Sequence, residues 1–362
     1  MMPMDNKKTK IAHMQELCAY REQLLHAPIL QNLFLELTLR CNEHCLHCGS
    51  ACGDVQSHEL SLEDYKRFLT KIKSDFKTKE PMIFVTGGEP LLRKDFFDIV
   101  GFANDLGFRW GMTSNGVLID RACAHKLREA GMRTVSISID GLPNTHDHFR
   151  QTPGGYDRAM QGVQNLIDEG GFSSIMVTTV VTHESIGELD ALYKVFNDID
   201  IDSWRIAGIE PMGRAKLHPE LLLTTEDQKY LLDFIRQKRL QGEPVTYGCS
   251  HYLGTDYERE VRDWYFLCNA GIYTASITAS GDMVACLDIE RRPELIQGNI
   301  LKDDFTDMWY NGYKAFRRNL CDENEKCRRC DAKVFCHGGP FHSWNFEEKR
   351  PEICMKGVLF DA

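Results

Sequence analysis

The stretch LFLELTLRCNEHCLHC, residues 33–48, joins an apolar run directly to three closely spaced cysteines. The run at 33–39 predicts a buried β-strand, because four to eight apolar residues in a row suit a strand that is covered on both faces. Cys41, Cys45 and Cys48 follow with C-x₃-C-x₂-C spacing in the loop after this strand. Three thiolates can hold three corners of a four-iron cube, and the fourth iron is then open to a small chelator.

Apolar runs with the composition of strands alternate with helical patterns after this point. The further predicted strands are MIFVT (82–86), FRWGMT (108–113), TVSISID (134–140), SIMVTTVV (174–181) and SWRIAGI (203–209). The alternation predicts right-handed βαβ units around a parallel sheet. Six strands are fewer than the eight that close a barrel, so we expect an α/β fold of the partial (β/α)6 TIM-like barrel type.

Polar motifs follow the predicted strands, each at the end where the strand enters the next loop. GGEP (87–90) comes after the second strand, SNG (114–116) after the third and DG (140–141) after the fourth. In βα barrels the carboxyl ends of the strands meet at one face, and the loops there carry the chemistry. We therefore expect these motifs to lie beside the cysteine loop.

A second group of cysteines occupies the C-terminal part of the chain. Cys268 and Cys286 lie in or beside two strand-like runs. Cys327, Cys330 and Cys336 form a C-x₂-C-x₅-C segment, and Cys354 follows it. This pattern predicts a small cysteine-rich domain held together by metal instead of a large apolar core. The predicted division of the chain is an N-terminal helical extension (1–30), the barrel (31–215), a helical connector (216–265) and the cysteine-rich domain (266–362).

Composition narrows the class of protein. The chain of 362 residues contains 14 cysteines and carries a net charge of −10. Its opening residues are polar and of mixed charge, unlike a signal peptide, so clustered cysteines indicate metal ligands in a reducing cytoplasm and not disulfides. No apolar run approaches the roughly 18–20 residues that a bilayer requires. We therefore expect no membrane partner. Because no basic face is evident to neutralise phosphates, we also expect no nucleic-acid partner.

The first cysteine loop resembles the signature of the radical S-adenosylmethionine (SAM) superfamily, which has an aromatic residue before the last cysteine; His47 stands there. The resemblance implies that the amino and carboxylate groups of SAM chelate the open iron of a 4Fe-4S cluster. An electron from the cluster then cleaves the sulfonium and yields a 5′-deoxyadenosyl radical. The alternative from the residues alone is a zinc site, with Cys52 as a fourth thiolate.

The same resemblance assigns residues that contact SAM. Gly87, Gly88 and Glu89 match the segment that meets the methionine amino group, where a carboxylate suits a positive charge. The remaining assignments are Ser138 and Asp140 to the ribose hydroxyls, Asn115 to the same cofactor, Arg150 to the SAM carboxylate, and Ile209 with Glu210 to adenine. For Arg150 the competing prediction is a solvated surface side chain.

The C-terminal cysteines resemble the SPASM domain, which holds auxiliary iron–sulfur clusters. The resemblance implies one auxiliary 4Fe-4S cluster on the four cysteines between 327 and 354, and a second on Cys268 and Cys286. The sequence departs from the family at Pro340, where a further cysteine is expected and no ligand is present. Either Cys249 and Cys321 replace it, or the second cluster has an open iron, is smaller or is absent. For the whole set the competing prediction is a zinc ribbon.

The resemblance implies a radical SAM oxidoreductase that abstracts hydrogen from its substrate. We expect a peptide or protein side chain, as for maturases of ribosomally made peptides, and a reducing partner such as flavodoxin or ferredoxin. A small molecule in cofactor or tetrapyrrole biosynthesis is a second hypothesis, and a non-catalytic iron–sulfur scaffold is a third. Formation of formylglycine, as in sulfatase maturases, is disfavoured because that group has an aspartate directly after the cysteine that Cys286 matches. Here Leu287 intervenes, and Asp288 is the candidate catalytic residue.

Overall fold

The computed structural model describes residues 6–53, 58–248 and 251–360, and these residues form one main sheet of nine strands. The order across the sheet is β7-β6-β5-β4-β3-β2-β1-β8-β9. The bounds of these strands are β1 (Asn32–Glu36), β2 (Met82–Thr86), β3 (Trp110–Ser114), β4 (Met132–Ser138), β5 (Ser174–Val181), β6 (Ser203–Gly208), β7 (Val245–Tyr247), β8 (Thr274–Ile277) and β9 (Met283–Val284).

Strands β1 to β6 are the six strands that the sequence predicts, and they pair in parallel in chain order. Successive side chains of a strand point to opposite faces. In β1, Leu33 and Leu35 belong to the apolar core, whereas Asn32 and Phe34 line a cavity on the concave side. The sheet thus separates a packed outer layer from a hollow interior, and the predicted partial barrel is confirmed.

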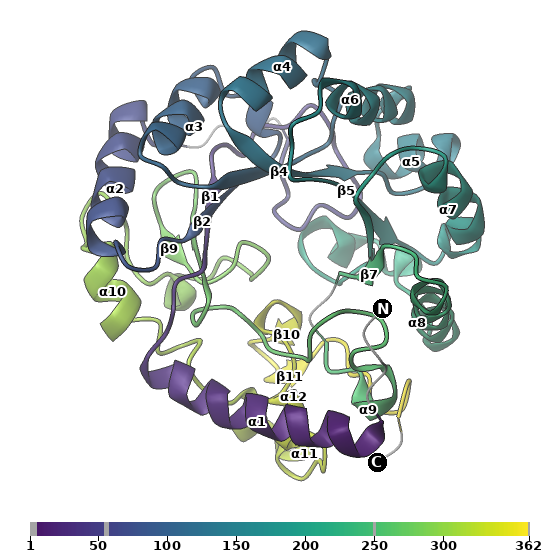
Figure 1. The fold of residues 1–362 in the computed structure, drawn as a ribbon. Coiled ribbons are helices and arrows are strands. Elements are labelled where there is room, and N and C mark those ends of the chain that lie inside the picture. The colour runs from purple at the N-terminus through teal and green to yellow at the C-terminus, as the bar shows by residue number, and fades with distance from the viewer. Residues whose placement is uncertain (1–5, 54–57, 249–250, 361–362) are drawn as a thin grey trace.

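Helices cover the outer face of the sheet from α2 to α8, while α1 lies beside the C-terminal region (Figure 1). Several begin at a side-chain cap that the sequence supplies; Ser61 and Asp64 form a capping box at the start of α2. The bounds of these helices are α1 (Lys7–His26), α2 (Leu62–Asp75), α3 (Phe96–Asp105), α4 (Arg121–Glu129), α5 (Pro143–Arg150), α6 (Gly155–Glu169), α7 (Leu189–Asn197) and α8 (Thr225–Leu240).

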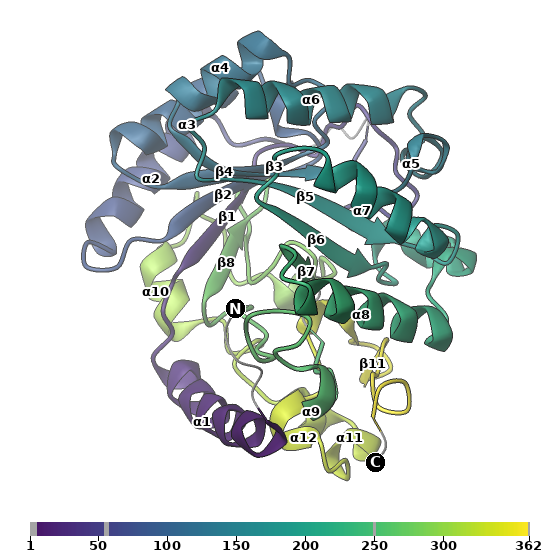
Figure 2. The same cartoon turned by 45° about the vertical axis from the view of Figure 1, so that its right-hand side comes forward.

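Strands from outside the six-strand series extend the sheet at both edges. β7 pairs in parallel with β6, and β8 from the cysteine-rich region pairs in parallel with β1, with Asn32 opposite Thr274. All residues of β8 are buried, and β9 follows it as an antiparallel edge. An uncovered β1 would expose a row of unpaired backbone groups. The cysteine-rich region therefore shares a continuous sheet with the barrel (Figure 2).

The remainder of the C-terminal region consists of short elements, and α1 packs on it. A buried ion pair joins Lys10 of α1 to Glu260 at 2.6 Å, and Arg21 donates to the carbonyl oxygen of Arg318 at 3.1 Å. Within the described ranges, every helix is too short or too polar to cross a membrane. The short elements are α9 (Gly254–Tyr257), α10 (Phe305–Asn311), α11 (Glu325–Arg328), α12 (Lys333–Cys336), β10 (Trp344–Asn345) and β11 (Arg350–Pro351).

Candidate active site

The cysteine loop, residues 41–53, follows β1 and brings several thiols into one buried place. The amide of Cys52 donates to Cys48 Sγ at 3.3 Å, and a hydrogen bond from the Cys52 thiol lowers the pKa of Cys48 to about 6. Burial raises the pKa of Cys41 to about 11, and it raises that of Cys45 further. The three predicted iron ligands thus share one loop, and Cys52 lies against the last of them.

Glu89 links the carboxyl ends of β2 and β3 to this loop. Its fully buried carboxylate accepts hydrogen bonds from Ser114 Oγ at 3.0 Å, from the Asn115 amide at 2.9 Å and from the Leu91 amide at 3.2 Å. Asn115 Nδ2 in turn donates to Asn42 Oδ1 of the cysteine loop at 2.8 Å. Burial raises the pKa of Glu89 to about 7. The GGEP and SNG motifs therefore lie beside the cysteine loop, as their positions after the strands predict.

Gly87 and Gly88 pack against the backbone that leads into the cysteine loop. Gly87 has a φ of +151°, and a Cβ there would lie 2.3 Å from the carbonyl oxygen of Thr38. A Cβ on Gly88 would lie 2.2 Å from the carbonyl oxygen of Arg40. Only glycine permits this approach. The two glycines thus hold the GGEP turn against the base of the loop, a packing role that exists in addition to the SAM contact implied by the resemblance.

Arg150 is the centre of a buried ionic network. It is 6% exposed, so the prediction of a solvated surface side chain is wrong. Its Nε donates to Asp140 Oδ2 at 2.7 Å, and its Nη1 donates to Glu43 Oε2 at 2.7 Å. Although burial opposes the charged form, the Arg150 guanidinium lowers the pKa of Asp140. Asp140 and Arg150, to which the resemblance gives separate SAM contacts, are thus held by each other and by Glu43 of the cysteine loop.

The other residues assigned to SAM lie around the same end of the barrel. His47 stacks on Phe149 with ring centroids 4.2 Å apart and an angle of 7° between the planes. Its Nε2 is 3.7 Å from Asp140 Oδ2, and burial lowers the pKa of His47 to about 4, so the ring is neutral. Ser138 is the last residue of β4, and Ile209 follows β6 directly. The strand ends therefore gather all of these residues near the cysteine loop.

Arg214 also holds the cysteine loop in place through hydrogen bonds, although no sequence motif includes it. Its Nε donates to the carbonyl oxygen of Cys45 at 2.8 Å, and its Nη1 donates to that of Cys52 at 2.6 Å. Its amide donates to the carbonyl oxygen of Cys48 at 3.0 Å. The preceding Gly213, with a φ of +51°, comes too close to Cys48 for a Cβ. The sequence signal for this role is its place shortly after β6, at the face where the other motifs lie.

We expect Arg214→Met to lower the amount of iron bound at the cysteine loop. The substitution removes two side-chain hydrogen bonds from a charged donor, each worth about 1.5–3 kcal/mol, and the loop that presents the thiols then loosens. Iron analysis after anaerobic reconstitution, with electron paramagnetic resonance of the reduced cluster, measures the effect. Arg128→Met, which removes a half-exposed ion pair with Glu169 on the outer helices, is the matched control. Wild-type cluster content in the Arg214 variant would contradict this role.

A cavity of about 480 Å³ lies on the concave side of the sheet. Its lining includes His47 and Gly49 of the cysteine loop, Thr178 of β5, Ile209, Cys268 and Cys286. Burial raises the pKa of both Cys268 and Cys286, and the neighbouring Cys268 raises that of Cys286 further. One space is therefore bordered by the first cysteine loop on one side and by two cysteines of the C-terminal group on the other.

Asp288 lies where this cavity meets a second one of about 360 Å³, and it lines both. Cys286 Sγ donates to Asp288 Oδ2 at 3.8 Å. Met212, Ile289 and His342 also border both cavities. The candidate catalytic residue therefore reaches the cavity wall although it stands one position later in the sequence than the family pattern.

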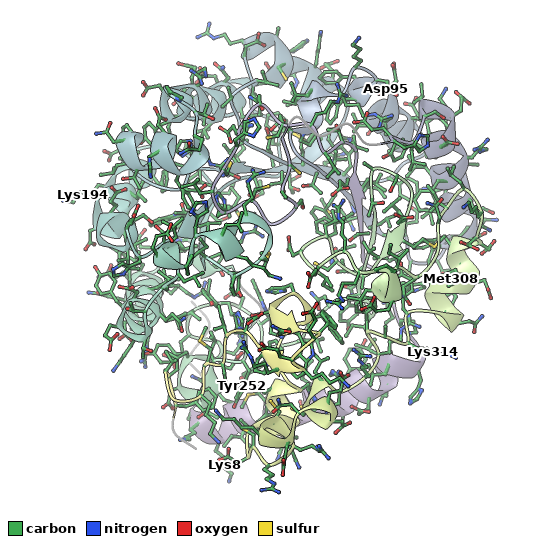
Figure 3. All side chains as sticks on the ribbon, turned by 180° about the vertical axis from the view of Figure 1, so that it is seen from behind. Lys8, Asp95, Lys194, Tyr252, Met308 and Lys314 are labelled. Carbon is green, nitrogen blue, oxygen red and sulfur yellow. The ribbon has the colours of Figure 1, made fainter. Side chains whose placement is uncertain are left out.

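A separate small cavity of about 50 Å³ lies in the C-terminal region, at the far side from the outer helices of the barrel. Tyr252 lines it, and Figure 3 shows Tyr252 on the opposite side of the molecule from Asp95, which precedes α3. Lys356 Nζ is 3.6 Å from Cys330 Sγ at its edge. The cysteines that line this cavity are Cys321, Cys327, Cys330, Cys336 and Cys354.

The structure therefore brings Cys321 to the four predicted ligands of the first auxiliary cluster and not to Cys268 and Cys286. Burial, with a smaller effect of the nearby Cys336, raises the pKa of Cys321 to about 12. Cys249, the other candidate replacement for the missing cysteine, lies outside the described residues. In the part of the chain that is described, Cys268 and Cys286 are the thiols that line the large cavity.

We expect the anaerobically reconstituted protein to bind at least two four-iron clusters, about eight irons per chain. One set of thiols lies in the cysteine loop, and the other lines the small C-terminal cavity. Iron and sulfide analysis with Mössbauer spectroscopy measures the count, and Cys123→Ser, which alters a cysteine of α4, serves as the control. A count near four irons per chain would contradict the prediction of an auxiliary cluster.

Comparison with known families agrees with the two groups of cysteines. Residues 35–196 match the radical SAM superfamily, and residues 268–331 match SPASM, an iron–sulfur cluster-binding domain. The first match covers the end of β1, the cysteine loop and the strands β2 to β5, and the second begins at Cys268. The two matches thus fall on the two regions that the cysteine spacings single out.

Individual proteins show the same relationship over most of the chain. Mycofactocin maturase MftC of Mycobacterium tuberculosis is 30% identical, over 88% of this chain and 79% of that protein. An AdoMet-dependent heme synthase of Methanosarcina barkeri is 27% identical, over 84% and 89%. Streptococcus suis SuiB, solved with S-adenosylmethionine, has the same fold, with a TM-score of 0.69 and 18% identity over 94% and 80% of the two chains. The chain therefore belongs to the radical SAM superfamily, and it carries a SPASM domain.

Family membership implies 4Fe-4S clusters and SAM as cofactors. The residues fit these groups. The cysteine loop offers three thiols at the required spacing, of which that of Cys45 is buried and the other two are partly buried, and the small C-terminal cavity offers five cysteines to iron. His47, which directly precedes Cys48, lines the large cavity. Of the two predictions for the cysteine loop, these findings support the iron–sulfur cluster over zinc.

Proposed function

We propose that this enzyme cleaves SAM at the cysteine loop and abstracts a hydrogen atom from a peptide or protein side chain. The supporting observation is the large cavity of about 480 Å³, which borders the cysteine loop at His47 and Gly49. It adjoins the second cavity of about 360 Å³, and the two share residues such as Asp288. Two adjoining cavities suit a peptide substrate with one side chain aimed at the loop.

The charges of the cavity walls favour a peptide over a polyanionic substrate. Charges of both signs are partly paired: Arg291 with Glu36 and Lys216 with Glu290 at 3.7 Å. Of the acidic residues, Glu347 pairs with Arg292 at 3.3 Å and Glu352 with Arg350 at 3.2 Å. A tetrapyrrole with several carboxylates would meet repulsion from an acidic lining of this kind. The basic residues that line the two cavities are Arg205, Lys216 and Arg291, and the acidic ones are Glu210, Asp288, Glu290, Glu347 and Glu352.

Asp288 is our candidate for the base that acts after hydrogen abstraction. A substrate radical that loses a proton to the Asp288 carboxylate and an electron to an auxiliary cluster is oxidised by two electrons in total. Flavodoxin or ferredoxin would supply the separate electron that cleaves SAM. Leu287 directly after Cys286 disfavours formylglycine formation. The proposed role of Asp288 supports that reaction nonetheless, because Asp288 lines the cavity although it stands one position later than in the family pattern.

Two related proteins support a peptide substrate. MftC is described as a maturase, and SuiB has been solved with its precursor peptide SuiA. The second candidate, a tetrapyrrole, is favoured by the identity of 27% to the Methanosarcina barkeri heme synthase. The cavity charges described above are our reason for preferring the peptide.

Mass spectrometry of reduced holoenzyme incubated with SAM and synthetic peptides tests the proposal. The peptides are those encoded by short reading frames beside the gene, with deuterium at the carbon positions of their side chains. We expect one peptide to lose one deuterium, which is recovered in 5′-deoxyadenosine, together with one proton, and we expect Asp288→Asn to slow product formation but not SAM cleavage. A tetrapyrrole carboxylate is assayed in parallel. Turnover of that compound, with every peptide unchanged, would overturn the proposal.

Glu89→Gln is expected to weaken SAM binding in a pH-dependent way, if the carboxylate meets the SAM amino group. The wild-type pKa of about 7 means that Glu89 is mainly protonated at pH 6 and mainly ionised at pH 8. The variant should therefore match the wild type at pH 6 and bind about tenfold more weakly at pH 8, because a charged hydrogen bond is lost. The ratio at each pH cancels the titration of SAM itself.

Equilibrium binding of SAM to the oxidised, reconstituted proteins measures both ratios. Glu169→Gln, on the outer helix α6 where the carboxylate pairs with Arg128 at 2.9 Å, is the matched control and should leave both affinities unchanged. Equal affinities of wild type and Glu89→Gln at pH 8 would remove Glu89 from the set of SAM contacts.

A further inference from the structure

Glu210, His251 and His342 meet at the wall of the large cavity, although they come from three distant segments. Glu210 follows β6 by two residues, His251 precedes α9, and His342 precedes β10. One potential ligand atom from each residue lies within 4.8 Å of the other two. His251 Nε2 is 2.5 Å from Glu210 Oε1. The His251 and His342 rings are 6.2 Å apart between centroids, at an angle of 75°.

His251 is buried, Glu210 and His342 are partly buried, and the hydrogen bonding of the group is incomplete. The side chains of His251 and Glu210 are 3% and 9% exposed. Among the described residues, the second carboxylate oxygen, Glu210 Oε2, is buried and has no hydrogen-bond partner at normal distance, although the nearby Ser343 hydroxyl helps His251 to lower the pKa of Glu210. A buried polar atom without a partner costs free energy. A simple pair of Glu210 and His251 therefore does not account for this oxygen or for the nearby imidazole of His342.

The surroundings hold the group in place. The carbonyl oxygen of His251 accepts a hydrogen bond from Arg262 Nη2 at 2.7 Å. Arg262 is in turn paired with Glu258 at 2.6 Å, and neither side chain is exposed. These contacts hold the backbone of His251 in place, and its ring reaches Glu210 from there. The position of His251 is therefore set by a rigid buried support.

One side of the group faces the substrate space. Glu210 and His342 line the large cavity, whereas His251 lines the small cavity with the five cysteines. Two imidazole nitrogens and one carboxylate oxygen are the donor set of zinc sites that keep a fourth position open, and ferrous iron uses the same set. An ion held here would turn its open position toward a substrate oxygen in the cavity.

We propose that Glu210, His251 and His342 bind one divalent transition-metal ion, best suited to zinc, in the wall between the substrate cavity and the small C-terminal cavity. The site uses none of the cysteines assigned to iron–sulfur clusters. Its open position would hold a carbonyl oxygen of the substrate and so orient the side chain that reacts. The site does not depend on which substrate the enzyme takes, because its ligands all come from this chain.

Zinc binding to the holoenzyme, with its clusters intact, tests this proposal without any turnover. The reconstituted protein is incubated anaerobically with zinc sulfate and desalted. Zinc and iron are then measured by elemental mass spectrometry, and sulfide by colorimetry. We expect about one zinc per chain with iron unchanged, and X-ray absorption at the zinc edge should show only nitrogen and oxygen neighbours. Under the same conditions Glu210→Gln and His342→Gln should retain about a tenth of this zinc or less.

Two further variants make the outcome decisive. His342→Asp keeps a metal-binding oxygen and should recover part of the zinc that His342→Gln loses. His218→Gln alters an exposed histidine that pairs with Glu220 at 3.0 Å and should bind zinc like the wild type. Sulfur neighbours around the zinc, equal zinc in wild type and Glu210→Gln, or no zinc in the wild type would each overturn the proposal. Should a variant also lose iron, the absorption spectrum of the wild type decides alone.

Discussion

Joint replacement of Cys41, Cys45 and Cys48 by alanine is expected to abolish formation of 5′-deoxyadenosine. These cysteines are the thiols that the loop after β1 presents at the spacing of the superfamily signature, and no cluster can assemble there without them. The thiols of the small C-terminal cavity lie elsewhere and should keep their iron. Chromatographic detection of 5′-deoxyadenosine after reduction with dithionite, together with iron analysis, measures both effects.

Cys52→Ser is the matched control for this triple variant, because the Cys52 thiol lies against Cys48 in the same loop. A cluster with one open iron needs only three protein thiolates, so we expect the Cys52 variant to cleave SAM. Loss of cleavage in Cys52→Ser would mean that a fourth thiolate closes the cluster. Cleavage that persists in the triple variant would refute the assignment of the site.

Arg150→Met is expected to destabilise the protein by about 3–5 kcal/mol, because removal of one partner leaves buried charges uncompensated. Arg150 is the cation between Asp140 and Glu43, which are each 1% exposed. Both carboxylates would remain buried, and Glu43 lies within the cysteine loop itself. Urea unfolding followed by circular dichroism, under anaerobic conditions with the clusters intact, measures the shift in midpoint.

The control for Arg150→Met is Arg128→Met on the outer surface of the barrel. Arg128 pairs with Glu169 at 2.9 Å, but its side chain is 39% exposed. An exposed ion pair contributes about 0–1 kcal/mol, so this variant should unfold close to the wild type. Similar unfolding midpoints for the two variants would show that the buried network does not stabilise the fold.

Much of the barrel and of the SAM site follows from short stretches of sequence. A run such as 82–86 shows its strand character through its own apolar residues, and Cys41, Cys45 and Cys48 lie within one loop. Because these strands are parallel, the motif that follows each strand lies at the same face. Because they are also adjacent in chain order, consecutive motifs are neighbours. The meeting of Glu89 with Asn115 is a direct consequence of this rule.

By itself, then, the sequence determined the βα series, the motifs at its carboxyl ends and the two groups of cysteines, since each depends on neighbours along the chain. Only the tertiary structure decided what joins distant segments. The pairing of β8 with β1, the hydrogen bonds of Arg214 to the cysteine loop and the place of Cys321 are of this kind. Such contacts depend on how the C-terminal region folds back on the open side of the barrel, and no periodicity or spacing in the chain encodes that path.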